Sequence, residues 1–426
     1  MIIPDLSRIV VENALKEEIA KADDKILKQR MKSVDFYEGA HEQYIAKHFE
    51  NGPQLPIYVA NMTKRLVNAR SLVYKESPIR SNDKYNELLP IDIDSKMRQM
   101  EKLTFLMGNM AMLSTYGENL EYHVVPYFWP MFLEGEVEPA AVYYPLANLN
   151  DKMNRIYEFW SDELHFRFDQ KGRFWDLEDE GINPYGVLPF TFAHRDPELV
   201  DEFWQSGAVD IVSANEHVDI LMQEAMIAAR IDALGIKFAS GVRDETPIKA
   251  GVDEIILLPD GVSLGRLEGG DPNRILEIAK AVIQSTALNN HLVARFADSE
   301  ARSGVALKVE NLENWDARAA SINDIWRPFE KRRFAIDRTI LNYHGISVED
   351  ELSIDYAEPA AVLDAAEQRA EWDWMLEKGL ITKKEILKQI DPDRFADDAE
   401  VESVLTEAQA EQAPPKPTSF LETLGV

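Results

Sequence analysis

Residues 208–234 read AVDIVSANEHVDILMQEAMIAARIDAL, a run of 27 residues that contains neither glycine nor proline. At a rise of about 1.5 Å per residue, a helix over this run would be roughly 40 Å long. Residues 235–271 interrupt the pattern with several glycines and one strand candidate, DEIILL. A second long helix is predicted from Pro272 to about Phe296, because Asp271 is a suitable N-cap and proline is favoured at the first helical position. The sequence therefore predicts two long helices that bracket a compact insert with β-structure.

The residues before this run divide into a helical part and a β part. Apolar residues at helical spacing predict helices over about 5–33, 58–76 and 95–115. Residues 118–192 instead carry short aromatic and β-branched runs separated by turn residues, a pattern typical of strands. Within them, LHFRFDQKGRFWDL alternates on both sides of Asp-Gln-Lys-Gly, which predicts a hairpin.

The residues after the second long helix predict a third one, which ends near Tyr343. Trp326 and Ile340 lie on its apolar face, and Pro328 is expected to kink it. The stretch ISVEDELSIDY that follows is a strand candidate, and the chain ends in an acidic region with helical periodicity. The predicted fold class is therefore α+β, predominantly helical.

Composition excludes several classes of protein. The 426 residues include 75 acidic and 46 basic side chains, no cysteine, and enough apolar and aromatic residues for a sizeable core. The absence of cysteine excludes disulfides, thiolate nucleophiles and cysteine-based zinc sites. No window approaches 18 uncharged apolar residues, so no membrane span is expected, and the first residues do not resemble a signal peptide. The net charge of -29 argues against a protein that grips nucleic acid over a broad basic surface.

Motifs for catalysis or metal binding are weak throughout the chain. GVSLG (261–265) matches the nucleophile elbow of serine hydrolases, with Ser263 as the nucleophile. The elbow needs a helix directly after the serine, but RLEGGD follows here, which favours an ordinary turn. The 8 histidines show no metal-binding spacing. No catalytic residue, no metal site and no cofactor is therefore predicted, and the chain is not expected to be an enzyme.

Five segments are more informative in their joint order than any single motif. They are FYEGAH (36–41), NMTKRLVNARSLVYKESPIR (61–80), NPYGVLPFTFAH (183–194), SGVALKVEN (303–311) and EKGLITKKEILKQI (377–390). In this order, and together with the predicted elements, they resemble the portal protein family of tailed double-stranded DNA bacteriophages, the head-to-tail connectors. The resemblance extends over almost the whole chain.

The resemblance implies a subunit with a wing, a stem of long helices, a small β-containing clip and a helical crown. Carried over to this sequence, the parts are 1–197 for the N-terminal wing, 198–234 for the first stem helix, 235–271 for the clip, 272–296 for the second stem helix, 297–304 for the tunnel loop, 305–359 for the kinked long helix and a wing strand, 360–411 for the crown and 412–426 for a flexible tail.

The resemblance also implies a function and partners. About twelve subunits would form a homo-oligomeric ring at one capsid vertex of the virion, assembled in the host cytoplasm. Double-stranded DNA would pass through its channel without sequence-specific contacts. The implied protein partners are terminase, head-completion or adaptor proteins, and the major capsid and scaffold proteins. No membrane is involved.

Two groups of residues are candidates for that function. The tunnel loop and its flanks, which would face the DNA, contain Arg295, Asp298, Glu300, Arg302 and Ser303. The clip contains three basic residues that are candidates for docking of partners: Lys237, Arg243 and Lys249. From Glu198 to Asp232 there are eight acidic residues and one arginine, which would give a ring a negative stem if those faces point inward.

Two alternatives stay open at this point. A serine hydrolase would use Ser263 and would be labelled there by an esterase probe. A non-portal helical protein of virion assembly, or a scaffold, would form a monomer, a dimer or a filament without an axial channel.

Overall fold

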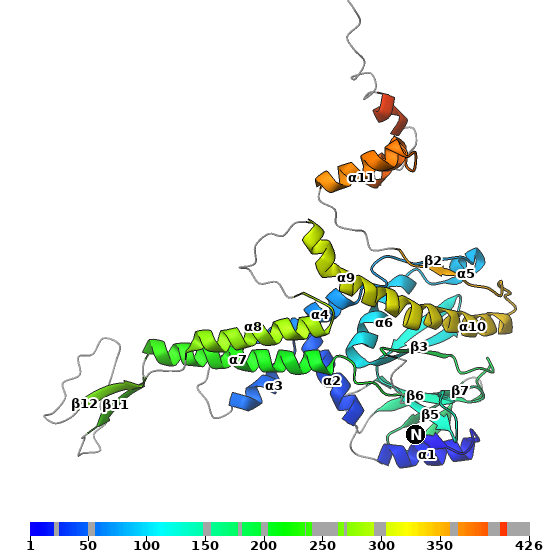
Figure 1. The fold of residues 1–426 in the computed structure, drawn as a ribbon. Helices are drawn as coiled ribbons and strands as arrows, with labels where there is room; N and C mark the ends of the chain where they lie inside the picture. The colour runs from blue at the N-terminus through cyan, green and yellow to red at the C-terminus, as the bar shows by residue number, and fades with distance from the viewer. Residues whose placement is uncertain are drawn as a thin grey trace, which may run out of the picture. The chain divides into compact units, whose positions relative to one another are not determined.

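The chain is an α+β protein in which helices and strands alternate in blocks (Figure 1). A computed structural model describes residues 1–20, 25–49, 56–147, 155–177, 181–196, 203–234, 236–240, 263–267, 271–293, 304–357, 365–390 and 401–406. The chain divides into two compact units, Met1–Ser299 with Glu310–Pro359 and Glu300–Val309 with Ala360–Val426.

The N-terminal part of the first unit is mainly helical. Its helices are α1 (Arg8–Ala20), α2 (Lys25–Glu38), α3 (Glu42–Ala46), α4 (Met62–Arg70), α5 (Asp83–Leu88) and α6 (Ile93–Met107), and a 3₁₀ turn (Lys47–Phe49) follows α3. The single helix expected over 5–33 is thus two helices, which serve different cores. Val11 and Leu15 of α1 pack on the aromatic residues of a β-sheet, whereas Val34 and Tyr37 of α2 pack on the core around α6.

The helix expected over 58–76 is much shorter, because side chains from other helices bind the backbone on both sides of it. Tyr58 and Ala60 donate their amides to side chains of a later helix, and Val73 and Tyr74 donate theirs to the buried carboxylate of Glu101. These amides are therefore satisfied without helical hydrogen bonds.

The helix expected over 95–115 ends eight residues early. Gly108 has φ of +86°, and a Cβ there would come within 2.4 Å of the Gln205 carbonyl oxygen, so the position requires glycine. The next residues, Asn109–Tyr116, form the central strand β3 of a three-stranded sheet. Six of its eight residues are buried, and such an apolar run on both faces does not distinguish strand from helix.

Two sheets make up the β part that the sequence predicts. The first has the order β10-β3-β4 and the second the order β1-β5-β6-β7-β8-β9. Their strands are β1 (Ile2–Ile3), β3 (Asn109–Tyr116), β4 (Leu120–Val125), β5 (Trp129–Leu133), β6 (Ala141–Ala147), β7 (Ile156–Ser161), β8 (His165–Asp169), β9 (Phe174–Asp176) and β10 (Phe190–His194). The hairpin predicted in LHFRFDQKGRFWDL is confirmed as the antiparallel pair β8–β9.

The two long helices and their β-insert are confirmed as elements. They are α7 (Val209–Leu234), β11 (Ile236–Ser240), β12 (Ser263–Leu267) and α8 (Pro272–Asn289). Asp271 caps α8 as expected, since its side chain accepts a hydrogen bond from the amide of Asn273. The strand candidate DEIILL lies outside the described residues.

The predicted third helix is confirmed up to Tyr343, and its irregularity has a clear local form. It consists of α9 (Gly304–Ser321), a π-helical turn (Ile322–Trp326) and α10 (Arg327–Tyr343). The turn ends two residues before Pro328, and Arg327 donates its amide to the Ile322 carbonyl, five residues back. The wider turn accommodates the proline, which has no amide hydrogen and crowds the preceding turn.

Three further pieces complete the described chain. Strand β13 (Ile354–Asp355) pairs antiparallel with β2 (Ile79–Arg80), so the strand predicted over 346–356 is only two residues long. The second unit contains α11 (Ala365–Glu377), α12 (Lys383–Ile390) and a helical segment at 401–406. None of the described helices combines the length and apolar character that crossing a lipid bilayer would need.

Candidate functional site

The most distinctive feature of the first unit is the antiparallel helical hairpin of α7 and α8, which lie side by side (Figure 1). One hydrogen bond, from Asn290 Nδ2 to Asp210 Oδ2 at 3.0 Å, joins the end of α8 to the start of α7. Asn290 is 2% exposed and also donates to the Thr286 carbonyl, which ends the helix. Helix α8 therefore stops at Asn289, seven residues before the predicted end at Phe296.

A polar stripe on α7 fixes the hairpin to the N-terminal helices. Asn215, Asp219 and Gln223 are spaced by four residues, so they lie on one face of the helix, and all three are buried. Asn215 Oδ1 accepts hydrogen bonds from the amide and hydroxyl of Thr63, both at 2.9 Å. Asp219 and Gln223 accept the amides of Ala60 and Tyr58. Three side chains of α7 thereby satisfy the extended backbone that leads into α4.

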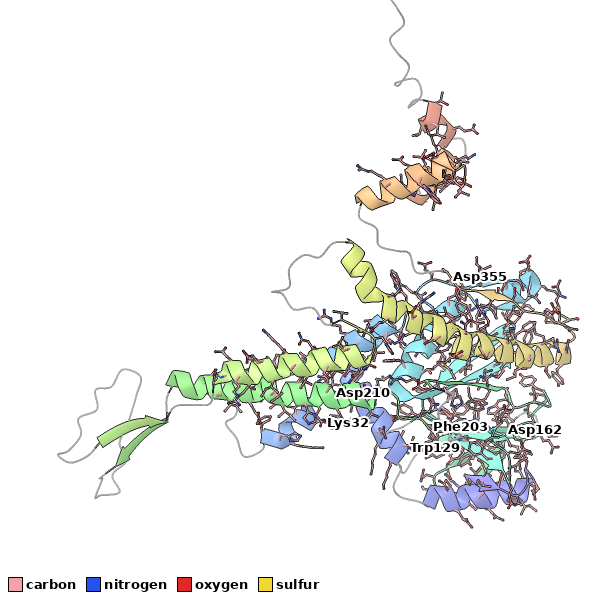
Figure 2. The ribbon with its side chains drawn as sticks, in the orientation of Figure 1. Lys32, Trp129, Asp162, Phe203, Asp210 and Asp355 are labelled. Carbon is pink, nitrogen blue, oxygen red and sulfur yellow. The ribbon has the colours of Figure 1, made fainter. Side chains whose placement is uncertain are left out.

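A histidine completes this anchor. His41 Nε2 lies 2.8 Å from Asp219 Oδ2, and both side chains are fully buried. The imidazole ring is stacked on Phe36, with 4.2 Å between the ring centroids. Lys32 of α2, which Figure 2 labels, forms an ion pair with Glu216 of α7 at 2.8 Å. The base of the hairpin is thus rigidly bound to α2, α3 and α4.

These contacts change the interpretation of the acidic residues on α7. Asp219 is fully buried, Glu216 is paired with Lys32, and Asp210 accepts a hydrogen bond from Asn290. Of the acidic residues counted there, Glu224 is exposed. The described surface of α7 is therefore less negative than the sequence count implies.

The hairpin also exposes apolar side chains. Met226 of α7 is 38% exposed, and Ile278 and Leu288 of α8 are 49% and 60% exposed. A contact with another protein surface at these positions would remove apolar area from water and would therefore be favourable.

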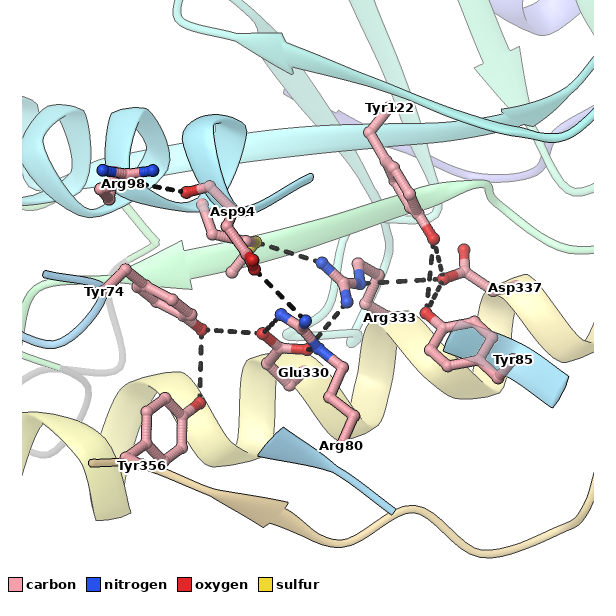
Figure 3. A network of polar contacts seen from close by, with 11 residues as sticks. Tyr74, Arg80, Tyr85, Asp94, Arg98, Tyr122, Glu330, Arg333, Asp337 and Tyr356 are labelled. Atoms are coloured by element: carbon pink, nitrogen blue, oxygen red, sulfur yellow. Dashed lines mark hydrogen bonds and ion pairs between the residues drawn. The ribbon is translucent and has the colours of Figure 1, made fainter. Parts of the chain in front are cut away.

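A buried ionic network holds the long α10 helix in place on the other side of the unit (Figure 3). Arg80 donates two hydrogen bonds to the carboxylate of Glu330, at 2.7 and 3.0 Å, in the bidentate arrangement that favours arginine over lysine. Arg333 donates to the same carboxylate at 2.8 Å and lies 3.7 Å from Asp337. Tyr85 and Tyr122 donate their hydroxyls to Asp337 at 2.6 and 2.7 Å. Helix α10 is thereby bound to β2, α5 and β4.

The network shifts the pKa values of its two acids in opposite directions. Burial opposes ionisation of Glu330, but Arg333 and Arg80 outweigh it, and the pKa of Glu330 is lowered. Burial prevails at Asp337 and raises its pKa, although Arg333 and the two tyrosines act against it. The pKa of Arg333 is raised well above its usual value by the surrounding acids and tyrosines, despite its burial. These residues form a structural support and have no access to a substrate.

The predicted site residues are only partly described. Arg295, Asp298, Glu300, Arg302 and Ser303 lie outside the described residues, as do Arg243 and Lys249. Lys237 lies on β11 and pairs in register with Arg266 of β12, so two basic residues are adjacent across this hairpin. Ser263 is the first residue of β12, paired with Ser240. A nucleophile elbow would need it in a tight turn between a strand and a helix.

The sequence did not reveal two groups of structural residues: the anchor, formed by Asn215, Asp219, Gln223 and His41, and the ionic network of α10. The only signal for the anchor is the four-residue spacing of Asn215, Asp219 and Gln223, and several other polar residues in the same run obscure it. Glu330, Arg333 and Asp337 have the spacing of charged pairs on an exposed helical face. Among the described residues, no group of three or more His, Asp or Glu side chains could hold a metal ion.

Comparison with known proteins gives structural matches alone. No protein-family model and no curated protein matches the chain. One solved structure that does match is the neck of a native GTA particle computed with C12 symmetry, at 13% identity, over 76% of this chain and 88% of that chain, with a TM-score of 0.42. Another is the neck of an empty GTA particle computed with C6 symmetry, at 12% identity and the same coverage, with a TM-score of 0.41. Likeness at this level leaves the function to be argued from the chain itself.

Proposed function

We propose that this chain is a portal-type subunit that assembles into a closed ring and forms a channel for double-stranded DNA. The observation that carries the proposal is the α7–α8 hairpin. Its two helices of 26 and 18 residues run antiparallel. A hydrogen bond from Asn290 to Asp210 joins the end of α8 to the start of α7, and the strands β11 and β12 lie between the other two ends. This is the stem and clip arrangement that the portal resemblance of the five sequence segments implies.

A ring also accounts for the exposed apolar side chains of the hairpin. In a ring each hairpin has a copy of itself on both sides, so that Met226 and Ile278 can be covered by neighbouring subunits. Such a subunit has a structural role in the virion rather than a catalytic one. DNA would be packaged, retained and ejected through the channel.

The proposal implies partners at different parts of the chain. Terminase and head-completion or adaptor proteins would dock at the β11–β12 end of the hairpin, where Lys237 and Arg266 are adjacent. Major capsid and scaffold proteins would contact the rest of the subunit during assembly. DNA would contact the segment between α8 and α9 without reading its sequence.

The mass of the purified full-length protein in solution tests the ring. Sedimentation velocity and native mass spectrometry over a range of concentrations should give one discrete species of about twelve times the subunit mass of 48.6 kDa. A subunit that stays monomeric or dimeric at every concentration, or that grows into open filaments, would contradict the proposal. Labelling of Ser263 by an esterase probe would favour a hydrolase instead.

A further inference from the structure

A cavity of about 140 Å³ lies where five segments of the first unit meet. It is lined by the end of α4, by α6, by the residues after β10, by the end of α8 and by the π-helical turn before α10. It shares residues with a wider cavity of about 660 Å³ along α9. The proposed channel function does not explain this cavity.

Two arginines line it. The guanidinium group of Arg70, the last residue of α4, forms no hydrogen bond or ion pair with any side chain or backbone group in the described part of the chain. Its pKa is lowered first by burial and then by the charge of Arg195, which together outweigh the opposite effects of Glu101 and Asp196. Arg195 is held over the ring of Phe105 at 4.2 Å and donates to Gly207 and Asn290. A guanidinium that is half-buried beside a second one is unfavourable unless an anion compensates it.

A third polar group on the cavity wall also has no partner. Thr104 of α6 is 2% exposed, and its hydroxyl makes no hydrogen bond with the described residues. A buried hydroxyl without a hydrogen bond costs free energy, and it can donate to an acceptor in the cavity. Thr104 and Arg70 come from different helices, so the two observations are independent.

The acids of the cavity compensate the charge of the two arginines only in part, and neither acid forms a hydrogen bond with Arg70. Both oxygens of Glu101 accept backbone amides, from Val73 and Tyr74. Asp196 Oδ2 lies 3.7 Å from Arg195 Nε, at the exposed side. Arg70 therefore keeps its donors for a ligand.

We propose that this cavity binds an oxyanion of the phosphate class, held by Arg70 and Arg195 with Thr104 as a further donor. Planar guanidinium groups and a hydroxyl match the several acceptor oxygens of such an anion. Glu313, Asp316 and Asp324 line the wider cavity outside, and their charge disfavours a long polyanion. The site thus fits a small phosphate better than a DNA backbone. The proposal does not depend on the portal function.

Calorimetric titration of the full-length protein with inorganic phosphate, at constant ionic strength against chloride, tests the site. Arg70→Gln should lower the affinity by roughly tenfold or more, because a charge-assisted hydrogen bond is lost. Arg65→Gln is the matched control, since Arg65 is exposed on the same helix. It should bind phosphate like the original protein. Equal affinity in both variants, or no phosphate binding by the original protein, would overturn the site.

Two further measurements separate a binding role from a structural one. Without phosphate, Arg70→Gln should unfold at the same temperature as the original protein or higher, because it removes a buried charge that the acids of the cavity compensate only in part. If this variant does not fold, Thr104→Val is used in its place, and it should weaken phosphate binding severalfold. Unchanged binding in Thr104→Val would then count against the site.

A short DNA duplex distinguishes the source of the phosphate. We expect inorganic phosphate to bind and the duplex not to displace it. Displacement by the duplex that Arg70→Gln abolishes would assign the site to backbone phosphate. If Arg70→Gln changes neither the affinity for the duplex nor the affinity for inorganic phosphate, the proposal is contradicted for both sources.

Discussion

Arg333 is fully buried, and two acids and two tyrosines around it, Glu330, Asp337, Tyr85 and Tyr122, make this burial possible. Glu330 lies one turn before it and Asp337 one turn after it on α10. A buried ion pair contributes little net stability compared with apolar residues of the same shape, but removal of one partner leaves an uncompensated charge. The network therefore acts as a requirement for the correct position of α10.

Substitution of Arg333 should strongly lower the free energy of unfolding. Arg333→Met would leave Glu330 and Asp337 buried without their cation and should lower the free energy of unfolding by about 3–5 kcal/mol. Chemical denaturation of the purified variant measures this loss. Arg338→Met is the control on the same helix, because Arg338 pairs with the exposed Asp350, and it should change stability by less than about 1 kcal/mol. Equal losses in both variants would contradict the account of the network.

Glu101 predicts a pH dependence of stability. Burial raises its pKa from 4.5 to about 7, although the amides of Val73 and Tyr74 and the charges of Arg318 and Arg70 act in the opposite direction. The folded protein therefore holds a proton that the unfolded chain releases at lower pH. Its stabilising contribution is complete below the unfolded pKa and is lost as the pH rises through about 7.

Comparison with Glu101→Gln isolates this contribution. The free energy of unfolding of the original protein should fall relative to the variant, by up to about 3 kcal/mol, between about pH 4.5 and pH 8. Denaturation curves at several pH values measure the difference. A difference that stays constant or grows with pH would show that Glu101 is ionised throughout.

At the scale of single residues, the burial of charged side chains was the feature least predictable from the sequence. Glu330, Arg333 and Asp337 follow the spacing of a solvated helical face, and only the residues that α10 meets, such as Arg80 and Tyr85, make them internal. By contrast, Trp326 and Ile340 were predicted on the apolar face of the third helix, and both are buried. Apolar periodicity indicates burial, whereas paired charges become internal only through distant partners.

At the scale of elements, α7 is bound to the body of the unit by side chains rather than by apolar packing alone. Asn215 contacts Thr63 twice, and also Ala60 and Asp219. This one amide therefore organises the segment before α4 as well as the base of the hairpin.

Loss of this amide should loosen the base of the hairpin locally. Asn215→Ala leaves the amide and hydroxyl of Thr63 without their acceptor, and should cost about 1–3 kcal/mol. Hydrogen–deuterium exchange should rise at residues 58–63 and at the start of α7, while the strand β3 keeps its protection. Glu224→Ala, on the exposed side of α7, should change neither exchange nor stability. Faster exchange in both variants would contradict the anchor.

The elements that the sequence predicted well are those whose ends carry local signals. Asp271 and Pro272 mark the start of α8, and the start predicted at Pro272 is confirmed. The predicted helix over 95–115 was wrong beyond Gly108, because an apolar run packed on both faces has no period to read. The short α4 was missed at both ends, since its neighbours accept the adjacent amides only in the folded protein.

At the scale of the whole molecule, the account depends on copies of the chain that cover the exposed apolar residues of the hairpin. Ile278 is half exposed near the middle of α8. Gln284 is exposed on the same helix and is polar. The two positions allow the same charge to be added at an apolar and at a polar site.

Ile278→Glu should prevent or weaken ring assembly while the subunit stays folded, because a charge would be buried at the contact between copies. Gln284→Glu, which adds the same charge elsewhere on α8, should assemble normally. Mass photometry gives the assembly state, and circular dichroism checks the fold. Normal assembly of Ile278→Glu would place the subunit contact elsewhere than on this face of the hairpin.

The global arrangement was inferred from the order of segments rather than from any one site. The two long helices with a β-insert follow from residues 208–289, because their length and caps are local properties. The residues proposed to face DNA, from Arg295 to Ser303, lie outside the described residues and remain predictions. The phosphate cavity could not be predicted, since Arg70, Thr104 and Arg195 come from three separate elements.

The most direct test of the central claim is electron microscopy of the purified full-length protein, with averaging of end-on and side views. The account predicts closed rings with an axial channel and with the α7–α8 hairpins around it, and labels attached near Lys237 should lie at one end of the channel. Discrete particles without a channel, open filaments, or rings whose hairpins point away from the axis would contradict it.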